Sequence, residues 1–186
     1  MLAPAQAREI LKSADLICSA SAVTHAVRRV AADITRVLAA DNPMVLCVMG
    51  GAVVFSGQLL PLLNFPLEFD YLHVTRYGNA TSGGRVEWKV FPDAAVAGRT
   101  VLVIDDILDE GHTMVEIRAR ALASGAARFL CAVLADKDIG RSKPMAADFV
   151  GLKLPNRYVF GFGMDVNGAW RNLPEIYALN EVKGEE

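Results

Sequence analysis

Hydrophobic positions follow a helical spacing over the first forty residues. Apolar side chains recur at i, i+3 and i+4 in segments 3–17 and 21–40, which predicts two amphipathic helices. The short apolar run 45–49 then predicts a buried strand. The glycine-opened segment 50–63 returns to helical spacing, so a third helix is expected there.

The rest of the chain alternates strands with a helix. Strands are predicted at 67–77, 85–91, 100–106, 128–135 and 158–165, and a helix at 112–125. The first two of these strands flank a polar, glycine-rich loop and are expected to form an antiparallel hairpin. Buried strands that alternate with helices are typical of an α/β fold with a mainly parallel sheet.

Composition and charge narrow the possible classes of protein. The chain has 186 residues, 53% of them hydrophobic, which fits one domain with a sizeable core. The net charge of −2 provides no basic field, so no nucleic-acid partner is expected. No apolar run approaches the ~20 residues of a membrane span, and segment 1–16 lacks the pattern of a secretory signal. Cys18, Cys47 and Cys131 are far apart and read as reduced thiols of a cytoplasmic protein.

The stretch VLVIDDILDEGHTM, residues 101–114, carries the most specific chemistry. Four apolar residues lead directly into Asp105 and Asp106, at the end of a predicted buried strand. Ligands of open α/β sheets bind beyond the carboxyl ends of the strands. Carboxylates there can accept hydrogen bonds from sugar hydroxyls or bind Mg²⁺ through water.

The second half of this stretch has the features of a phosphate-binding turn. Gly111 lets a ligand approach the backbone, Thr113 offers a hydroxyl, and the first N–H groups of the next helix favour an anion. A sugar phosphate would satisfy both halves of the stretch. The alternative is an acidic cluster that only complements the helix dipole. That alternative explains Asp109 and Glu110 but leaves the two acids at the strand end unexplained.

The sequence contains neither a P-loop nor a G-x-G-x-x-G motif. Instead, VLVIDDILDEGHT resembles the phosphoribosyl-pyrophosphate motif of type I phosphoribosyltransferases. Segment 154–179 is similar to the C-terminal segment of hypoxanthine-guanine phosphoribosyltransferases. Residues 49–51 match the pyrophosphate loop of that family, and residues 76–84 match its mobile lid. The resemblance implies a mainly parallel sheet flanked by helices, with a core at about 40–150 and a hood from about 1–20 and 151–186.

The same resemblance implies a set of ligand-binding residues. Those for phosphoribosyl pyrophosphate are Asp105, Asp106, Glu110, Gly111, His112, Thr113, Gly50, Gly51, Arg76, Tyr77 and Arg171. Those for the purine are Lys137, Tyr158, Val159 and Asp165. The metal ligands for Mg²⁺ would be Asp165, Asp105 and Asp106.

The implied reaction displaces pyrophosphate from the ribose by a purine nitrogen, which gives IMP and GMP. Asp109 would take the proton from purine N7, Lys137 would donate to the 6-oxo group, and Tyr158 would stack on the base. Each of these residues also has a purely structural interpretation. Asp109 could be a carboxylate at the start of a helix, Lys137 a solvated lysine, and Tyr158 a half-buried aromatic residue of a strand. Asp165 could instead be a turn residue and Arg171 a surface arginine.

The sequence departs from the family at three positions. Glu110 replaces a small or hydroxyl residue, Gly50 replaces a lysine in many relatives, and Arg76 replaces a serine. The alternative function is a regulator that keeps the fold and senses phosphoribosyl pyrophosphate. A regulator of nucleic acid should add a basic surface, and the 19 basic residues here face 21 acidic ones. By resemblance, the expected assembly is a homodimer or homotetramer.

Overall fold

A six-stranded sheet forms the centre of the molecule. The computed structural model describes residues 2–76 and 86–180. Within them, the sheet has the order β4-β3-β2-β5-β6-β7. Its strands are β2 (Met44–Met49), β3 (Glu68–Arg76), β4 (Val86–Val90), β5 (Thr100–Leu108), β6 (Arg128–Lys137) and β7 (Phe149–Leu154). All neighbours are parallel except β3 and β4, so the predicted α/β architecture with an antiparallel hairpin is confirmed.

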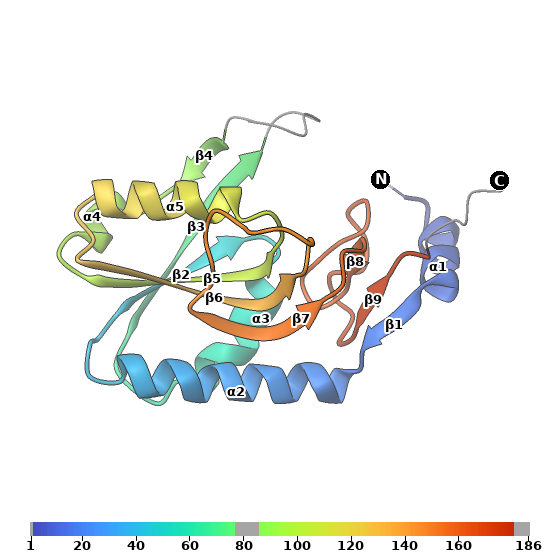
Figure 1. The fold of residues 1–186 in the computed structure, drawn as a ribbon, viewed down its shortest axis with the longest axis horizontal. Helices are drawn as coiled ribbons and strands as arrows, with labels where there is room; N and C mark the ends of the chain where they lie inside the picture. The colour runs from blue at the N-terminus through green and yellow to red at the C-terminus, as the bar shows by residue number, and fades with distance from the viewer. Residues whose placement is uncertain (1, 77–85, 181–186) are drawn as a thin grey trace.

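Helices cover both faces of this sheet. The long α2 (Ala20–Leu38) and the shorter α3 (Val53–Leu59) lie on one face, and α5 (His112–Ala123) lies on the other (Figure 1). A short turn of 3₁₀ helix, η1 (Leu60–Leu62), follows α3, and α4 (Asp93–Val96) precedes β5. Ser19 caps α2, because its hydroxyl accepts a hydrogen bond from the Ala22 N–H at 3.3 Å.

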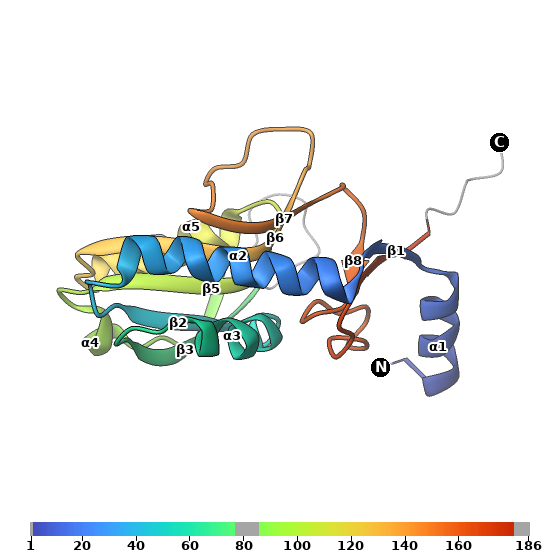
Figure 2. The same cartoon turned by 90° about the horizontal axis from the view of Figure 1, so that it is seen from below.

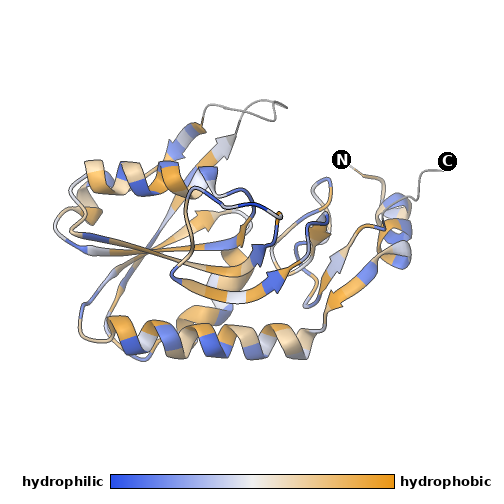
Figure 3. Cartoon of the chain, viewed as in Figure 1, coloured by the Kyte–Doolittle hydropathy of each residue, from blue (hydrophilic) through white to orange (hydrophobic). Residues whose placement is uncertain are grey.

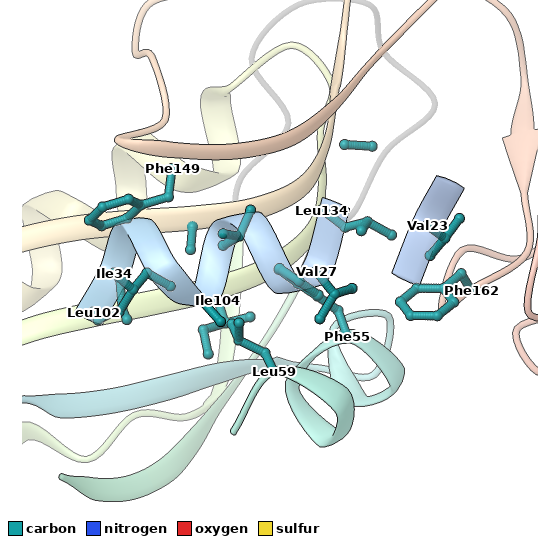
Figure 4. Packing of buried hydrophobic residues seen from close by; sticks show 14 of the residues in the cluster. Val23, Val27, Ile34, Phe55, Leu59, Leu102, Ile104, Leu134, Phe149 and Phe162 are labelled. Atoms are coloured by element: carbon teal, nitrogen blue, oxygen red, sulfur yellow. The ribbon is translucent and has the colours of Figure 1, made fainter. Parts of the chain in front are cut away.

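The core follows from the alternation of side chains along the strands. On the α2 face, Val27 and Ile34 pack with Phe55 of α3 and Ile104 of β5 (Figure 4). The neighbouring positions of β5 point to the opposite face, where Val103 packs in the cluster that includes Ile117 of α5. Figure 3 shows the result: the central strands are mostly apolar, whereas α2 alternates between apolar and polar positions.

A second, small sheet lies at one end of the molecule. Its order is β1-β9-β8, with β1 (Asp15–Cys18), β9 (Ile176–Ala178) and β8 (Val159–Phe160) all antiparallel. Helix α1 (Pro4–Ser13) lies beside it, and both views place these elements beyond the carboxyl ends of the central parallel strands (Figures 1 and 2). N- and C-terminal segments therefore combine at this end, as expected of the hood.

Two sequence-based predictions of secondary structure were wrong. The helix predicted over 3–17 ends at Ser13, and residues 15–18 form a strand that pairs with β9. The strand predicted over 158–165 covers only Val159–Phe160. It ends because Gly161, Phe162 and Gly163 have φ values of +100°, +49° and +103°, which no extended strand contains. Strands β7 and β9 and helix α4 were not predicted.

Other expectations concern the thiols, membranes and the lid. Cys47 and Cys131 are buried free thiols, as expected, and Cys18 is a half-buried one. Within the described part of the chain, no helix is both long and apolar enough to cross a bilayer. Strands β3 and β4 pair as a hairpin, but the predicted lid, residues 76–84, falls mostly outside the described residues.

Candidate active site

The carboxyl ends of β5 and β6 bring two charged side chains together. Their register pairs Leu108 with Asp136, so the next residues, Asp109 and Lys137, are neighbours. Lys137 Nζ donates to Asp109 Oδ2 at 3.0 Å. The lysine side chain is only 12% exposed, whereas the aspartate is 53% exposed. The fold thus brings into contact two charged side chains that lie 28 residues apart in the sequence.

The strand acids Asp105 and Asp106 lie inside β5, two positions further into the sheet than predicted from the pattern. Both are half-buried. Asp105 Oδ1 accepts the Asp106 N–H at 2.9 Å, and Asp106 Oδ1 accepts the Ile107 N–H at 2.8 Å. Burial raises the pKa of Asp105 well above its usual range, and the neighbouring charge of Asp106 raises it further. Burial also raises the pKa of Asp106, although hydrogen bonds and Arg171 act in the opposite direction.

Two glycines allow the chain to pack against Asp106. A Cβ added to Gly51 would lie 1.8 Å from Asp106 Oδ2, so any side chain there would displace the carboxylate. A Cβ added to Gly163 would lie 2.1 Å from the Gly51 carbonyl oxygen. The loop after β2 and the turn after β8 are therefore stacked on the acidic strand with no space between them. In contrast, a Cβ on Gly50 would meet nothing within 4 Å.

The turn between β5 and α5 forms the first pocket, of about 200 Å³. Gly111 has a φ of +86° at the N-terminal end of α5, a conformation that glycine adopts without strain. The pocket is lined by Asp105, Ile107, Leu108, Asp109, Glu110, Gly111, His112, Thr113 and Met114. Glu110 forms an ion pair with Arg141, whose Nη2 lies 2.7 Å from its Oε1.

A second pocket of about 230 Å³ lies on the other side of Asp109. It is lined by Asp106, Ile107, Asp109, Lys137, Tyr158, Val159, Met164, Asp165 and Arg171. The two pockets share Ile107 and Asp109, so one ligand could extend across both. The ring of Tyr158 is exposed at the rim, and its hydroxyl donates to the Asp165 carbonyl oxygen at 3.2 Å.

Asp165 and Arg171 are bonded to each other at the wall of the second pocket. Arg171 Nη2 lies 2.5 Å from Asp165 Oδ1, and Arg171 Nη1 donates to the Gly163 carbonyl at 2.5 Å. The other oxygen of Asp165 accepts the Gly168 N–H at 2.6 Å. This network ties the turn after β8 together. Burial raises the pKa of Asp106, and the positive charge of Arg171 partly opposes that rise.

The fold thus brings most of the predicted site residues to one edge of the sheet. Arg76 is the last residue of β3, and Tyr77 lies outside the described residues. Among residues 2–76 and 86–180, no group of three or more acidic, histidine or cysteine side chains is arranged to hold a metal ion. The three acids predicted as metal ligands therefore do not form a complete protein cage.

Sequence reasoning missed Ile107 and Met164, which line the second pocket, and Gly163, which packs on Gly51. Ile107 lies within the acidic motif, so its position between Asp106 and Asp109 could have identified it. No local signal marks Met164. The glycine pattern of FGFG could have suggested a turn, but not its contact with the loop after β2.

Comparisons with known proteins agree with this geometry. Residues 14–167 match the family model described as the phosphoribosyl transferase domain. The hypoxanthine-guanine-xanthine phosphoribosyltransferase of Tritrichomonas foetus is 36% identical over 156 residues, 83% of this chain and 85% of that protein. The hypoxanthine-guanine phosphoribosyltransferase of Streptococcus thermophilus (strain CNRZ 1066) is 36% identical over 149 residues, 80% and 83% of the two chains. A solved structure of a hypoxanthine-guanine-xanthine phosphoribosyltransferase has a TM-score of 0.74 at 32% identity, covering 89% of this chain and 94% of that one.

Proposed function

The chain belongs to the phosphoribosyltransferase family, and we propose that it is a purine salvage enzyme of the hypoxanthine-guanine type. It transfers the 5-phosphoribosyl group from phosphoribosyl pyrophosphate to hypoxanthine and guanine, which yields IMP, GMP and pyrophosphate. The observation that carries the proposal is the Asp109–Lys137 pair in a pocket that also contains Tyr158 and borders the acidic strand. A proton acceptor and a cation meet there beside an exposed aromatic ring.

Asp105 and Asp106 hold the ribose in this mechanism. Their carboxylates accept hydrogen bonds from the ribose hydroxyls, which compensates the burial that raises the pKa of both groups. As pyrophosphate leaves, positive charge develops on the ribose. Fixed negative groups beside that charge stabilise the transition state more than the ground state.

The purine contacts Asp109 and Lys137 through two neighbouring groups of its ring system. The 6-oxo group and N7 are neighbours on one edge of the purine. Lys137 donates to the 6-oxo oxygen, and Asp109 accepts the N7 proton as N9 attacks the ribose. Both side chains must leave their contact in the free protein in order to bind the purine. Tyr158 stacks on the face of the ring, Val159 contacts its edge, and Asp165 receives the exocyclic amine of guanine.

The phosphates bind on either side of the ribose. Backbone N–H groups of Glu110, Gly111 and His112, with the Thr113 hydroxyl, hold the 5-phosphate at the start of α5. Pyrophosphate binds Gly50 and Gly51 on one side, with Arg171 as a cationic ligand. The resemblance to the family adds Arg76 and Tyr77 to the proposed ligands of this substrate.

The residues present fit Mg²⁺ as a partner of the substrate. Mg²⁺ keeps several waters and is usually bound by one or two carboxylates together with substrate phosphates, so a complete protein cage is not required. Asp105, Asp106 and Asp165 are the candidate carboxylates, reached directly or through water. When bound, the ion neutralises charge on the leaving pyrophosphate.

We extend the proposal to the organisation of the molecule. The chain is a single domain, with a core at about 40–150 and a hood from about 1–20 and 151–186. It acts in the cytoplasm as a homodimer or homotetramer. Exposed apolar side chains support self-association: Phe69 and Tyr71, on one face of β3, are 49% and 42% exposed. Light scattering coupled to size exclusion tests the assembly.

A direct assay tests the activity. The purified protein is incubated with hypoxanthine, phosphoribosyl pyrophosphate and Mg²⁺, and IMP is followed by absorbance. Turnover that depends on all three components is expected. Tight binding of phosphoribosyl pyrophosphate without turnover would contradict the proposal and favour a regulator.

A further inference from the structure

We propose that Lys143 is a positioning residue that sets the relative placement of Asp109 and Lys137, an inference that rests on the proposed function. Lys143 lies in the segment between β6 and β7, outside the acidic motif and outside both pockets of the site. It acts through the residues that immediately precede the two charged groups.

The ammonium of Lys143 joins the ends of two strands. Lys143 Nζ donates to the carbonyl oxygen of Leu108 at 2.6 Å and to Asp136 Oδ1 at 2.5 Å. Leu108 directly precedes Asp109, and Asp136 directly precedes Lys137. We call these two contacts the Lys143 bridge. It thus fixes the β5 backbone and the β6 side chain at the last position before each group that faces the purine.

The bridge lies at the point where the backbone pairing between β5 and β6 ends. The Leu108–Asp136 pair is the last in the β5–β6 register, so Asp109 stands one residue beyond it. The strand pairing alone does not determine how far Asp109 lies from Lys137. A contact from a third segment at this pair supplies that constraint.

Burial makes the bridge more than a surface ion pair. The side chains of Lys143 and Asp136 are only 11% and 13% exposed. Burial acts to raise the pKa of Asp136, but hydrogen bonds from Lys143 and Lys153 outweigh it, and the pKa is below its usual value. Without Lys143, the buried carboxylate of Asp136 would keep only the exposed Lys153 as a partner, and its Oδ1 would lose the hydrogen bond that compensates for burial.

Lys153 provides a matched control in the same cluster. Its Nζ also lies 2.5 Å from Asp136, on the other carboxylate oxygen, but the lysine side chain is 73% exposed. It makes no contact with the Leu108 carbonyl, which Lys143 occupies. Removal of Lys153 therefore changes the charge near Asp136 without releasing the end of β5.

The geometry of a near-attack complex is sensitive to small displacements. A misplacement of about 1 Å can reduce the rate ~10²-fold. Lys143→Met keeps the length of the side chain and removes both hydrogen bonds. We expect kcat with hypoxanthine to fall at least ~10-fold. KM for phosphoribosyl pyrophosphate should change less, because the two groups that Lys143 Nζ contacts, the Leu108 carbonyl and the Asp136 carboxylate, are not among the groups proposed to bind that substrate.

The test compares Lys143→Met, Lys143→Arg and Lys153→Met at a temperature well below each variant's Tm. The arginine fork can reach both acceptors, so Lys143→Arg should recover much of the lost kcat. Lys153→Met should resemble the wild type. A wild-type kcat for Lys143→Met, or an equal loss in Lys153→Met, would overturn the proposal. If Lys143→Met does not fold, Asp136→Asn replaces it: a reduced kcat is expected, and an unchanged one overturns the proposal.

Hydrogen–deuterium exchange separates this inference from the proposed function. If the wild type itself shows no turnover, the proposed function fails, and peptides covering 105–111 and 134–139 decide the bridge. Faster exchange of both peptides in Lys143→Met than in Lys153→Met supports it. Equal exchange in the two variants would overturn it, whatever the activity.

Discussion

The ammonium of Lys137 lies 3.0 Å from the carboxylate of Asp109, so the cation and the base of the proposed reaction are bonded to each other before the purine arrives. This spacing suits the 6-oxo and N7 atoms, which are neighbours on the purine. The contact also gives each group a partner in the absence of substrate. When the pair opens, water can replace the partner of the half-exposed Asp109, whereas the largely buried Lys137 needs the purine oxygen as its new partner.

Asp109→Asn should slow the chemical step and leave sugar-phosphate binding largely intact. Asparagine keeps the shape and can still accept a hydrogen bond from Lys137, but it cannot take the N7 proton. The expected loss in kcat is ~10²-fold or more. Single-turnover kinetics provide the measurement, and Asp33→Asn on the surface of α2 is the control. An unchanged single-turnover rate would remove Asp109 from the mechanism.

Lys137→Ala should remove most of the kcat/KM for hypoxanthine. Among the described residues, the only other cation that lines the second pocket is Arg171, which is bonded to Asp165 and Gly163. Discrimination against adenine should narrow in this variant, because the lysine that rejects an amino group is gone. The measurement is kcat/KM for both bases, with Lys12→Ala as the control. A loss that is equal for every base would argue against a contact with the 6-oxo group.

Asp105→Asn should stabilise the free protein and weaken its binding of phosphoribosyl pyrophosphate. A raised pKa means that the folded state binds more protons than the unfolded state above pH ~4, so stability falls as the pH rises through this window. Asparagine removes that dependence and can keep the hydrogen bond to the Asp106 N–H. We expect a gain of about 1 kcal/mol at pH 7, or ~2–4 °C in Tm.

The test of Asp105→Asn is the difference in Tm between variant and wild type across pH 4 to 8. The difference should grow with pH. A difference that shrinks with rising pH would mean that the Asp105 carboxylate is stabilised rather than destabilised by the fold.

Gly50 and Gly51 should respond in opposite ways to substitution. The Cβ of a lysine at position 50 would meet nothing within 4 Å, and its ammonium adds a cation to the pyrophosphate loop, so KM for phosphoribosyl pyrophosphate should fall about 2- to 5-fold. Gly51→Ala forces the Asp106 carboxylate to move and should cost ~1–3 kcal/mol of stability. Thermal melts and steady-state kinetics of both variants provide the measurement. A stable Gly51→Ala with normal substrate binding would contradict the described packing.

Local signals in the sequence identified the part of the site that lies in one stretch of chain. Asp105, Asp106 and Asp109 stand within five residues, and their place near the carboxyl end of a strand can be recognised without a structure, although the strand continues to Leu108. The sheet and its hairpin also follow from local periodicity. Lys137 required the resemblance to a family, because a lysine at a strand end has no distinctive local pattern.

The features that escaped prediction depend on contacts between distant segments. Strand β1 pairs with β9, where Asp15 lies opposite Ala178. The spacing of apolar residues around Asp15 is helical and therefore did not predict this strand. The turn after β8 interrupts an apparently strand-like segment because Gly163 must fit against Gly51. The Lys143 bridge likewise joins three segments that no local pattern connects.

A competition between bases tests the central claim most directly. Equimolar hypoxanthine, guanine and adenine are offered together with phosphoribosyl pyrophosphate and Mg²⁺, and the nucleotides are quantified by mass spectrometry. Lys137 presents only donors, so adenine would leave it facing an amino group, and such mismatches can cost ~10⁴–10⁵-fold. The account predicts IMP and GMP with almost no AMP. AMP in amounts comparable to IMP would contradict the assignment of Lys137 and of a 6-oxopurine substrate.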